Sequence, residues 1–349
     1  MEQPRPDLPP PATPSGRKSA LAFFGVVLLL FLPGILAQAT FRPAGLVWSE
    51  VFAFLLPALV ATTGSNLRLR GWLKLRRPSG VAVALGALVG GAGYLVAVAV
   101  LLAVQRVLPR AWIELFDPSK IFEGPAWERV LVAAVAVVVA PPCEEIAFRG
   151  YVQTTLALRR SPAVAIAGSA ALFAAMHLDP VRFPALLVLG SVFGWLTWRA
   201  GSVWPAVAAH AANNAVTSLL FLSVAAPSEP AEPASLAWIA VVGVVGALAL
   251  GALVWAYRAA TAGPPPPSAS VELRDPADPS IGFSAVRVPA PLRAGAAAGV
   301  ALLLAILLAG AVGAGRRHRP VPSVPGVGAP GLRERRDMTG GGAPAGRGS

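Results

Sequence analysis

Long apolar stretches separated by short polar segments dominate the hydrophobic pattern of this chain. Five long stretches contain no Asp, Glu, Lys, Arg or His; they lie between Lys18 and Arg42, Glu50 and Arg68, Arg77 and Arg106, Glu232 and Arg258, and Arg293 and Arg316. Each can hold the roughly 20 apolar residues that cross the hydrocarbon core of a bilayer. Helices are the expected spanning form, because backbone groups in lipid must be satisfied within their own segment.

The pattern predicts an all-α fold, a polytopic transmembrane helix bundle of about eight core helices plus one extra C-terminal span. The spans are expected near residues 19–39, 45–62, 80–105, 128–158, 163–178, 183–199, 203–223, 236–257 and 293–315. We divide the chain into a disordered tail (1–18), a transmembrane bundle (19–258), a Pro-rich linker (259–292), the additional span (293–315) and a disordered basic tail (316–349).

Composition supports a membrane protein. The 349 residues are 55% hydrophobic and 13% charged, whereas a soluble domain carries about 25% charged residues. The net charge of +12 lies in loops and tails, so the expected partner is the lipid bilayer and not nucleic acid. The only cysteine is Cys143, which excludes an intramolecular disulfide and a zinc site built from cysteines.

Basic loops predict the orientation in the membrane. The loop from Asn66 to Ser79 carries five Lys and Arg residues and no acid, so the positive-inside rule places it in the cytoplasm together with the N-terminus. We expect a multi-pass protein of the cytoplasmic membrane, and the Ala-, Gly-, Pro- and Arg-rich composition suggests a bacterial inner membrane. Nine crossings would put the basic tail outside, which suggests that one predicted span is re-entrant or miscounted.

Several ionisable residues fall inside apolar segments, where such residues are costly and indicate function. Glu145 and Arg149 are four residues apart and are expected to pair on one helix face. Glu144 has no evident local partner, so it is the carboxylate that we expect to be free for chemistry. His177 and His210 complete the set, while Glu50 and Glu128 near the starts of their spans are expected at the membrane interface.

Helix geometry brings some of these residues together. Glu144 and His177 each lie about 16 residues from the turn at Arg159-Arg160-Ser161-Pro162, or about 24 Å along a helix, so an antiparallel hairpin places them opposite each other. His210 shares a face with Asn214, but it converges with the other two only if the turn at 200–202 lies deeper in the protein. Pro141-Pro142 should kink the helix and free backbone carbonyls beside Glu144.

Three motifs carry a family resemblance. They are Glu144-Glu145-x-x-x-Arg149, Phe173-x-x-x-His177 and His210-x-x-x-Asn214, in this order and each within an apolar segment. At these residues the chain resembles the CAAX-processing and bacteriocin-processing family of intramembrane proteases, also called the Abi or type II CAAX prenyl endopeptidase family. The resemblance covers about residues 125–225, which we take as the catalytic core.

The resemblance implies hydrolysis of a peptide bond in a hydrophobic peptide or a membrane-anchored protein. It implies that Glu144 and His177 hold and activate the attacking water, and that His210 and Asn214 stabilise the oxyanion. Two His and a Glu also match the ligands of a catalytic zinc, so Glu144, His177 and His210 could bind Zn²⁺ or another divalent metal. An activated water without a metal would use the same residues.

Two other functions use the same pattern. A transporter or proton-coupled carrier could employ Glu144, His177 and His210 as an ion relay. A catalytically silent protein of this fold could act in immunity or as a scaffold. Substitution of Glu144 separates these functions, since a protease loses cleavage, a carrier loses coupled flux and a scaffold loses nothing.

Overall fold

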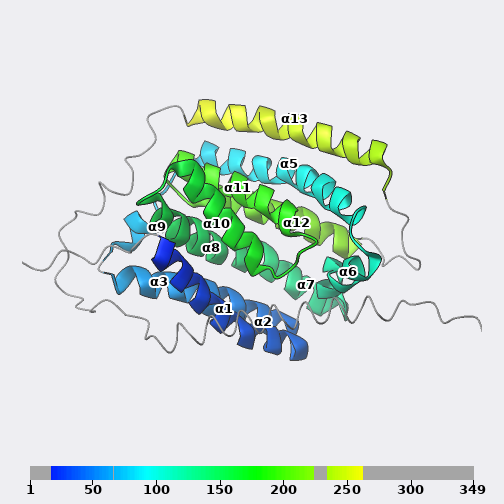
Figure 1. Cartoon of the computed structure of the whole chain (residues 1–349), viewed down its shortest axis with the longest axis horizontal. Helices are drawn as coiled ribbons and strands as arrows, with labels where there is room; N and C mark the ends of the chain where they lie inside the picture. The colour runs from blue at the N-terminus through cyan, green and yellow to red at the C-terminus, as the bar shows by residue number, and fades with distance from the viewer. Residues whose placement is uncertain (1–16, 66, 224–233, 262–349) are drawn as a thin grey trace, which may run out of the picture.

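The computed structural model describes residues 17–65, 67–223 and 234–261, and within these residues every regular element is a helix. The helices lie roughly side by side in layers (Figure 1). The helix α13 (Leu236–Ala260) lies along one side and α5 (Gly80–Gln105) lies next to it. The N-terminal helices form the opposite side, and the remaining helices fill the middle.

The first layer comes from two predicted spans. One is α1 (Arg17–Thr40), and the other is a continuous stretch of α2 (Arg42–Trp48), the π-helical segment η1 (Ser49–Leu55) and α3 (Leu56–Thr63). Short helices complete the ends of the bundle: α4 (Leu69–Trp72), α6 (Arg110–Leu115) and the 3₁₀ turn η2 (Pro118–Phe122).

A long interrupted helix runs through the middle of the bundle. It consists of α7 (Ala126–Ala134), η3 (Val135–Val139), α8 (Ala140–Glu145), η4 (Ile146–Val152) and α9 (Gln153–Ala157), where η3 and η4 are π-helical. Three helices pack around it: α10 (Pro162–Met176), α11 (Phe183–Ala200) and α12 (Trp204–Ser223). More than half of the most apolar part of Ala126–Ala157 is buried, so this segment is the core of the fold.

Glycines allow α5 to approach α12 very closely. A Cβ atom on Gly86 would lie 2.4 Å from the carbonyl oxygen of Pro205, and one on Gly90 would lie 1.9 Å from that of Ala209. The small residues Gly86-x-x-x-Gly90 thus form the kind of contact by which membrane helices associate. Because Ala209 precedes His210, this contact also fixes the position of His210 along the bundle.

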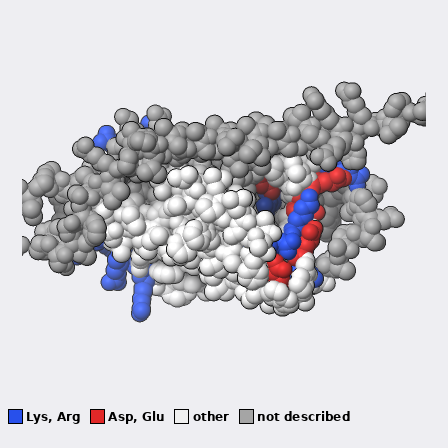
Figure 2. All heavy atoms as spheres, turned by 90° about the horizontal axis from the view of Figure 1, so that it is seen from below, with Lys and Arg blue, Asp and Glu red and all other residues white. Residues whose placement is uncertain are grey.

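Charge separates the two ends of the bundle. The connections at one end, around residues 67–79, 158–161 and 199–203, carry Arg and Lys and no acid. At the other end, Arg42 donates to the Glu123 carbonyl and pairs with Glu128 at 3.4 Å. Figure 2 shows the same asymmetry on one face, with basic side chains alone at one end and mixed charges at the other.

The structure confirms the helical bundle and a helix at each of the eight spans predicted before residue 258. Within the described residues six helical stretches are long and apolar enough to cross a membrane, namely Ser19–Thr40, Arg42–Thr63, Gly80–Gln105, Ala126–Ala157, Phe183–Ala200 and Leu236–Ala260. The helix Pro162–Met176 is apolar but shorter. The predicted linker 259–292, the span 293–315 and the basic tail fall almost entirely outside the described residues.

Candidate active site

The kink predicted at Pro141-Pro142 is a change of helical register. The backbone N–H of Ala140 bonds to the carbonyl of Val135, five residues earlier. The next residue, Pro141, has no N–H, so the carbonyl of Ala136 has no donor from its own helix. The side-chain amide of Asn214 on α12 fills this position, with Nδ2 donating to Ala136 O at 2.8 Å. Buried carbonyls require such partners.

Glu145 and Arg149 form the predicted ion pair. Arg149 Nη1 donates to Glu145 Oε1 at 2.9 Å, and both side chains are completely buried. Arg149 also donates through Nη2 to the carbonyl of Gly190 on α11 at 3.0 Å. Its guanidinium carbon lies 4.3 Å from the ring centre of Phe173 and 5.6 Å from that of Phe193. The cation is therefore held by hydrogen bonds and by two aromatic faces.

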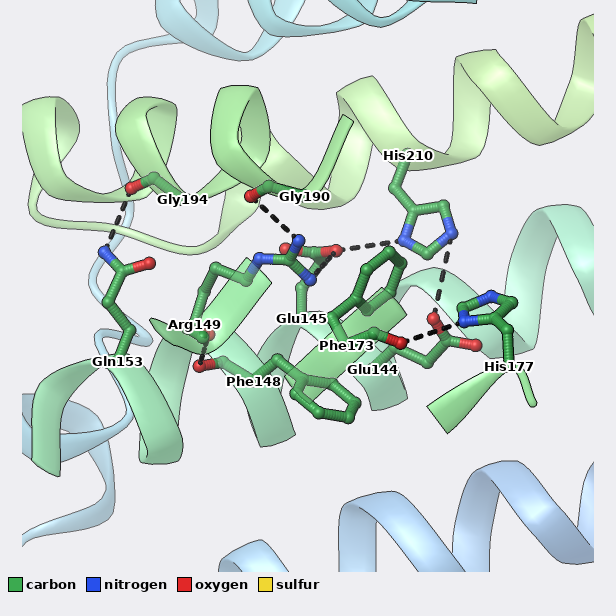
Figure 3. A network of polar contacts seen from close by, with 11 residues as sticks. Glu144, Glu145, Phe148, Arg149, Gln153, Phe173, His177, Gly190, Gly194 and His210 are labelled. Carbon is green, nitrogen blue, oxygen red and sulfur yellow. Dashed lines mark hydrogen bonds and ion pairs between the residues drawn. The ribbon is translucent and has the colours of Figure 1, made fainter. Parts of the chain in front are cut away.

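One helical turn away the same pattern repeats. Gln153 Nε2 donates to the carbonyl of Gly194 at 3.0 Å, so Arg149 and Gln153 contact carbonyls that are also four residues apart. A Cβ on Gly190 would lie 3.2 Å from Arg149 Nη2, and one on Gly194 would lie 2.7 Å from Gln153 Oε1. The two glycines thus allow α11 to lie against the central helix at the site (Figure 3).

His210 lies between the two neighbouring glutamates. Its Nδ1 is 3.0 Å from Glu145 Oε1, and its Nε2 is 3.9 Å from Glu144 Oε2. The ring stacks on Phe193, with centroids 5.3 Å apart and planes tilted by 22°. Because His210 and both glutamates are buried, these contacts form in a site shielded from solvent by protein.

His177 reaches the same place from the end of α10. Its Nδ1 lies 3.0 Å from the carbonyl oxygen of Phe173, which can only accept a hydrogen bond. The Phe173 ring packs against both imidazoles at steep angles of 66° and 86°, with centroid distances of 4.9 Å to His177 and 5.8 Å to His210. In Figure 3 the Glu144 carboxyl group points towards the two rings, which agrees with the expectation that Glu144 and His177 face each other.

The convergence of His210, which the sequence left open, has a clear structural cause. The turn before α12 is buried beneath the basic loop: Ser202 and Val203 are about 1% and 0% exposed. Ser202 Oγ donates to the carbonyl of Arg76, and the Val203 N–H donates to that of Lys74. The turn therefore lies deeper than the loop that covers it, and α12 starts far enough inside for His210 to reach the glutamates.

The structure brings all six predicted site residues to one region, with one difference of role. Glu144, Glu145, Arg149, His177 and His210 are connected through direct contacts or through Phe173. Asn214 is instead bonded to the Ala136 carbonyl, so its assignment to the oxyanion stays a prediction.

Sequence reasoning misplaced one glutamate and missed two other residues. Glu50 was expected at the interface, but it is only 5% exposed and its Oε2 has no hydrogen-bond partner. The available signal was an acidic residue inside the predicted span 45–62. Gln153 and Phe193 were not singled out either, although Gln153 lies four residues after Arg149.

Three of the site residues were also the predicted ligands of a metal ion. The residue types Glu144, His177 and His210 suit zinc, but within the described segments no group of three His, Cys, Asp or Glu side chains is close enough to hold a metal ion. The metal site implied by these three residues therefore stays a prediction.

Fold and site together define a multi-pass helical membrane protein with a buried glutamate–histidine centre. Residues 125–216 match the family model described as Rce1-like, type II CAAX prenyl endopeptidase. The match confirms the resemblance seen in the three motifs, and it supports an intramembrane protease of the CAAX type at the level of the family. No curated protein and no solved structure matches the chain significantly.

Proposed function

We propose that this protein is an intramembrane endopeptidase that hydrolyses a peptide bond by means of a water molecule activated by Glu144. The observation that carries this proposal is the Glu144 Oε2 atom, which is buried without a hydrogen-bond partner and lies 3.9 Å from His210 Nε2. A buried carboxylate with one free oxygen beside two imidazoles can accept a proton and later return it.

The reaction follows from this arrangement. The water oxygen attacks the carbonyl carbon of the substrate while one water proton passes to Glu144. The carbonyl electrons move onto oxygen, and Glu144 then protonates the amide nitrogen as the C–N bond breaks. Asn214 is the proposed oxyanion donor, since an amide nitrogen carries two hydrogens and only one is bonded to Ala136. Such a donor contributes about 3–4 kcal/mol to catalysis.

The substrate that suits this site is a hydrophobic peptide or a membrane-anchored protein. The site residues lie on helices among apolar segments, so a substrate must reach it from the membrane or through the bundle. The connections free of acid on one side of the bundle support an orientation with these connections in the cytoplasm. Together with the Ala-, Gly-, Pro- and Arg-rich composition, this orientation leads us to propose a bacterial cytoplasmic membrane as the location.

A cleavage assay tests the proposal. The purified protein in nanodiscs is incubated with a library of quenched fluorescent hydrophobic peptides, alongside Glu144→Ala, His177→Ala and the control Thr62→Val. Thr62 is a buried polar residue of α3 whose hydroxyl bonds within its own helix. Wild type and Thr62→Val should cleave while the two site variants should not, and parallel samples with a chelator report on a metal.

Two results contradict the proposal. Cleavage by Glu144→Ala at the wild-type rate would exclude Glu144 as the base. A folded wild type that cleaves no peptide but shows ion-coupled flux abolished by Glu144→Ala would favour a carrier.

A further inference from the structure

Glu145 Oε1 receives two donors, and this determines which nitrogen of His210 carries a hydrogen. Arg149 Nη1 lies 2.9 Å from this oxygen and His210 Nδ1 lies 3.0 Å from it. A guanidinium only donates, and the buried Arg149 cation requires the Glu145 carboxyl group as its partner. Glu145 Oε1 therefore accepts both hydrogen bonds, and the hydrogen of the second bond sits on His210 Nδ1.

In the neutral ring the other nitrogen of His210 then presents a lone pair. A neutral imidazole has one donor and one acceptor nitrogen, so a hydrogen on Nδ1 leaves Nε2 as the acceptor. This Nε2 faces Glu144 Oε2, which is itself an acceptor without a partner. Two acceptors 3.9 Å apart do not bond to each other; they require a molecule that donates to both.

We propose that Glu145 and Arg149 are positioning residues that fix His210 in its Nδ1–H form, and that the attacking water donates one hydrogen bond to His210 Nε2 and the other to Glu144 Oε2. This inference rests on the proposed hydrolysis, and it assigns His210 a different role in the resting protein from the oxyanion donor implied by the motif resemblance. Carboxylate–histidine pairs fix a tautomer in the same way at other catalytic sites.

A water held in this way is ready to react. Both of its hydrogens are engaged, so an oxygen lone pair remains free for the substrate carbonyl. As the new C–O bond forms, the O–H bond directed at Glu144 breaks and the carbonyl electron pair moves to oxygen. The second hydrogen stays on the attacking oxygen and keeps its hydrogen bond to His210 Nε2. This hydrogen bond holds the tetrahedral intermediate in place while Glu144 delivers its proton to the leaving nitrogen.

Packing makes the His210 ring a fixed element. Its face stacks on Phe193, and the Phe173 ring packs against it nearly at a right angle. Arg149, which holds Glu145, is itself anchored on the carbonyl of Gly190. Figure 3 shows this chain of contacts running from Gly190 through Arg149 and Glu145 to His210 and Glu144. A ring held by two aromatic neighbours and by a hydrogen bond at Nδ1 keeps Nε2 directed at Glu144.

Nitrogen NMR on the intact protein tests the tautomer independently of activity. The chain has only three histidines, at positions 177, 210 and 318, so protein labelled with ¹⁵N-histidine in nanodiscs gives few signals, which His177→Gln and His318→Gln assign. At a pH where the rings are neutral, His210 should carry its hydrogen on Nδ1. Glu145→Gln should shift the population towards Nε2–H, while Ser169→Ala should leave it unchanged.

Ser169→Ala is a matched control, because Ser169 is fully buried and its hydroxyl donates to the Phe148 carbonyl beside the site. In peptide cleavage, Glu145→Gln should lower kcat by about 10- to 100-fold with little change in KM, and Ser169→Ala should stay near wild type. The double variant Glu145→Gln/Arg149→Met, which leaves no unpaired charge, should show the same tautomer shift if Glu145→Gln alone does not fold.

Each outcome is decisive. A His210 that carries its hydrogen on Nε2 in the wild type, or a tautomer unchanged by loss of Glu145, overturns the inference. If the tautomer shifts as expected but the wild type cleaves no peptide, the positioning of His210 stands and the proposed function fails.

Discussion

Asn214 on α12 donates a hydrogen bond to the carbonyl of Ala136, 2.8 Å away, at the point where Pro141 removes the backbone donor of the central helix. The two features that the sequence showed separately, a proline pair and an asparagine in an apolar helix, are therefore one structural unit. The unit ties α12, which carries His210, to the helix that carries Glu144.

This relationship predicts a compensating pair of substitutions. Asn214→Leu leaves the buried Ala136 carbonyl unpaired, so the free energy of unfolding should fall by about 1–3 kcal/mol. Pro141→Ala supplies a backbone N–H in the register of Ala140, so Asn214→Leu/Pro141→Ala should recover most of the loss. Denaturant unfolding in detergent measures all three variants, and simple additivity of the two single effects would contradict the relationship.

The close contact of α5 with α12 predicts opposite effects at two adjacent glycines. A Cβ on Gly90 would lie 1.9 Å from the Ala209 carbonyl oxygen, whereas one on Gly91 meets no atom within 4 Å. Gly90→Ala should destabilise the protein by about 1–3 kcal/mol through overpacking and should lower cleavage by displacing His210. Gly91→Ala should be neutral or slightly stabilising. Thermal unfolding and initial rates test both, and equal behaviour of the two variants would refute the contact.

The buried ion pair predicts a strong interaction between two substitutions. Arg149→Met leaves the carboxylate of Glu145 without its cation, and breaking a fully buried pair costs about 3–5 kcal/mol. Glu145→Gln/Arg149→Met removes both charges and should regain much of that loss in stability without regaining activity. A double-mutant cycle from chemical unfolding provides the coupling energy, and a coupling near zero would show that the pair does not act as a unit.

The burial of Lys74 predicts that the free energy of unfolding depends on pH. Burial of the Lys74 side chain within the basic loop lowers its pKa from the usual 10.5 to about 8. Between these two pH values the unfolded chain binds a proton that the folded protein does not bind, so the contribution of Lys74 to the free energy of unfolding should rise with pH. At neutral pH Lys74 is charged in the folded protein, and the burial of this charge lowers the free energy of unfolding.

Lys74→Met should therefore be more stable than wild type at pH 7 and should lack this part of the rise above about pH 8. Lys74→Arg keeps its charge over the whole pH range. It should therefore lack the rise in stability with pH and remain less stable than Lys74→Met. Unfolding temperatures measured from pH 7 to pH 10 test the assignment. An unchanged slope in Lys74→Met would show that another group is responsible.

Much of this architecture could be predicted from the sequence because long charge-free runs in lipid admit few solutions. The positions of the helices and the Glu145–Arg149 pair follow from hydrophobic length and from the spacing of four residues. The three motifs also indicated the helices whose ionisable residues the structure brings together, since ionisable residues in apolar segments are rare.

Other features depend on tertiary contacts that no local pattern encodes. The approach of His210 requires the turn at Ser202 and Val203 to be covered by the loop around Lys74 and Arg76. The burial of Glu50 results from the packing of the first layer against the central helix, so its distance from the end of a span was misleading. The second bond of Glu145, to His210, joins residues 65 positions apart.

The most direct test of the central claim is hydrolysis in ¹⁸O-labelled water, followed by mass spectrometry of the products. A hydrophobic peptide that the wild type cleaves in nanodiscs should yield a new C-terminal carboxylate that contains one oxygen from solvent. Glu144→Gln, which keeps the shape of the side chain but cannot accept the proton, should leave the peptide intact. Cleavage by Glu144→Gln at the wild-type rate, or a peptide left intact by the folded wild type across a broad library, would contradict the account.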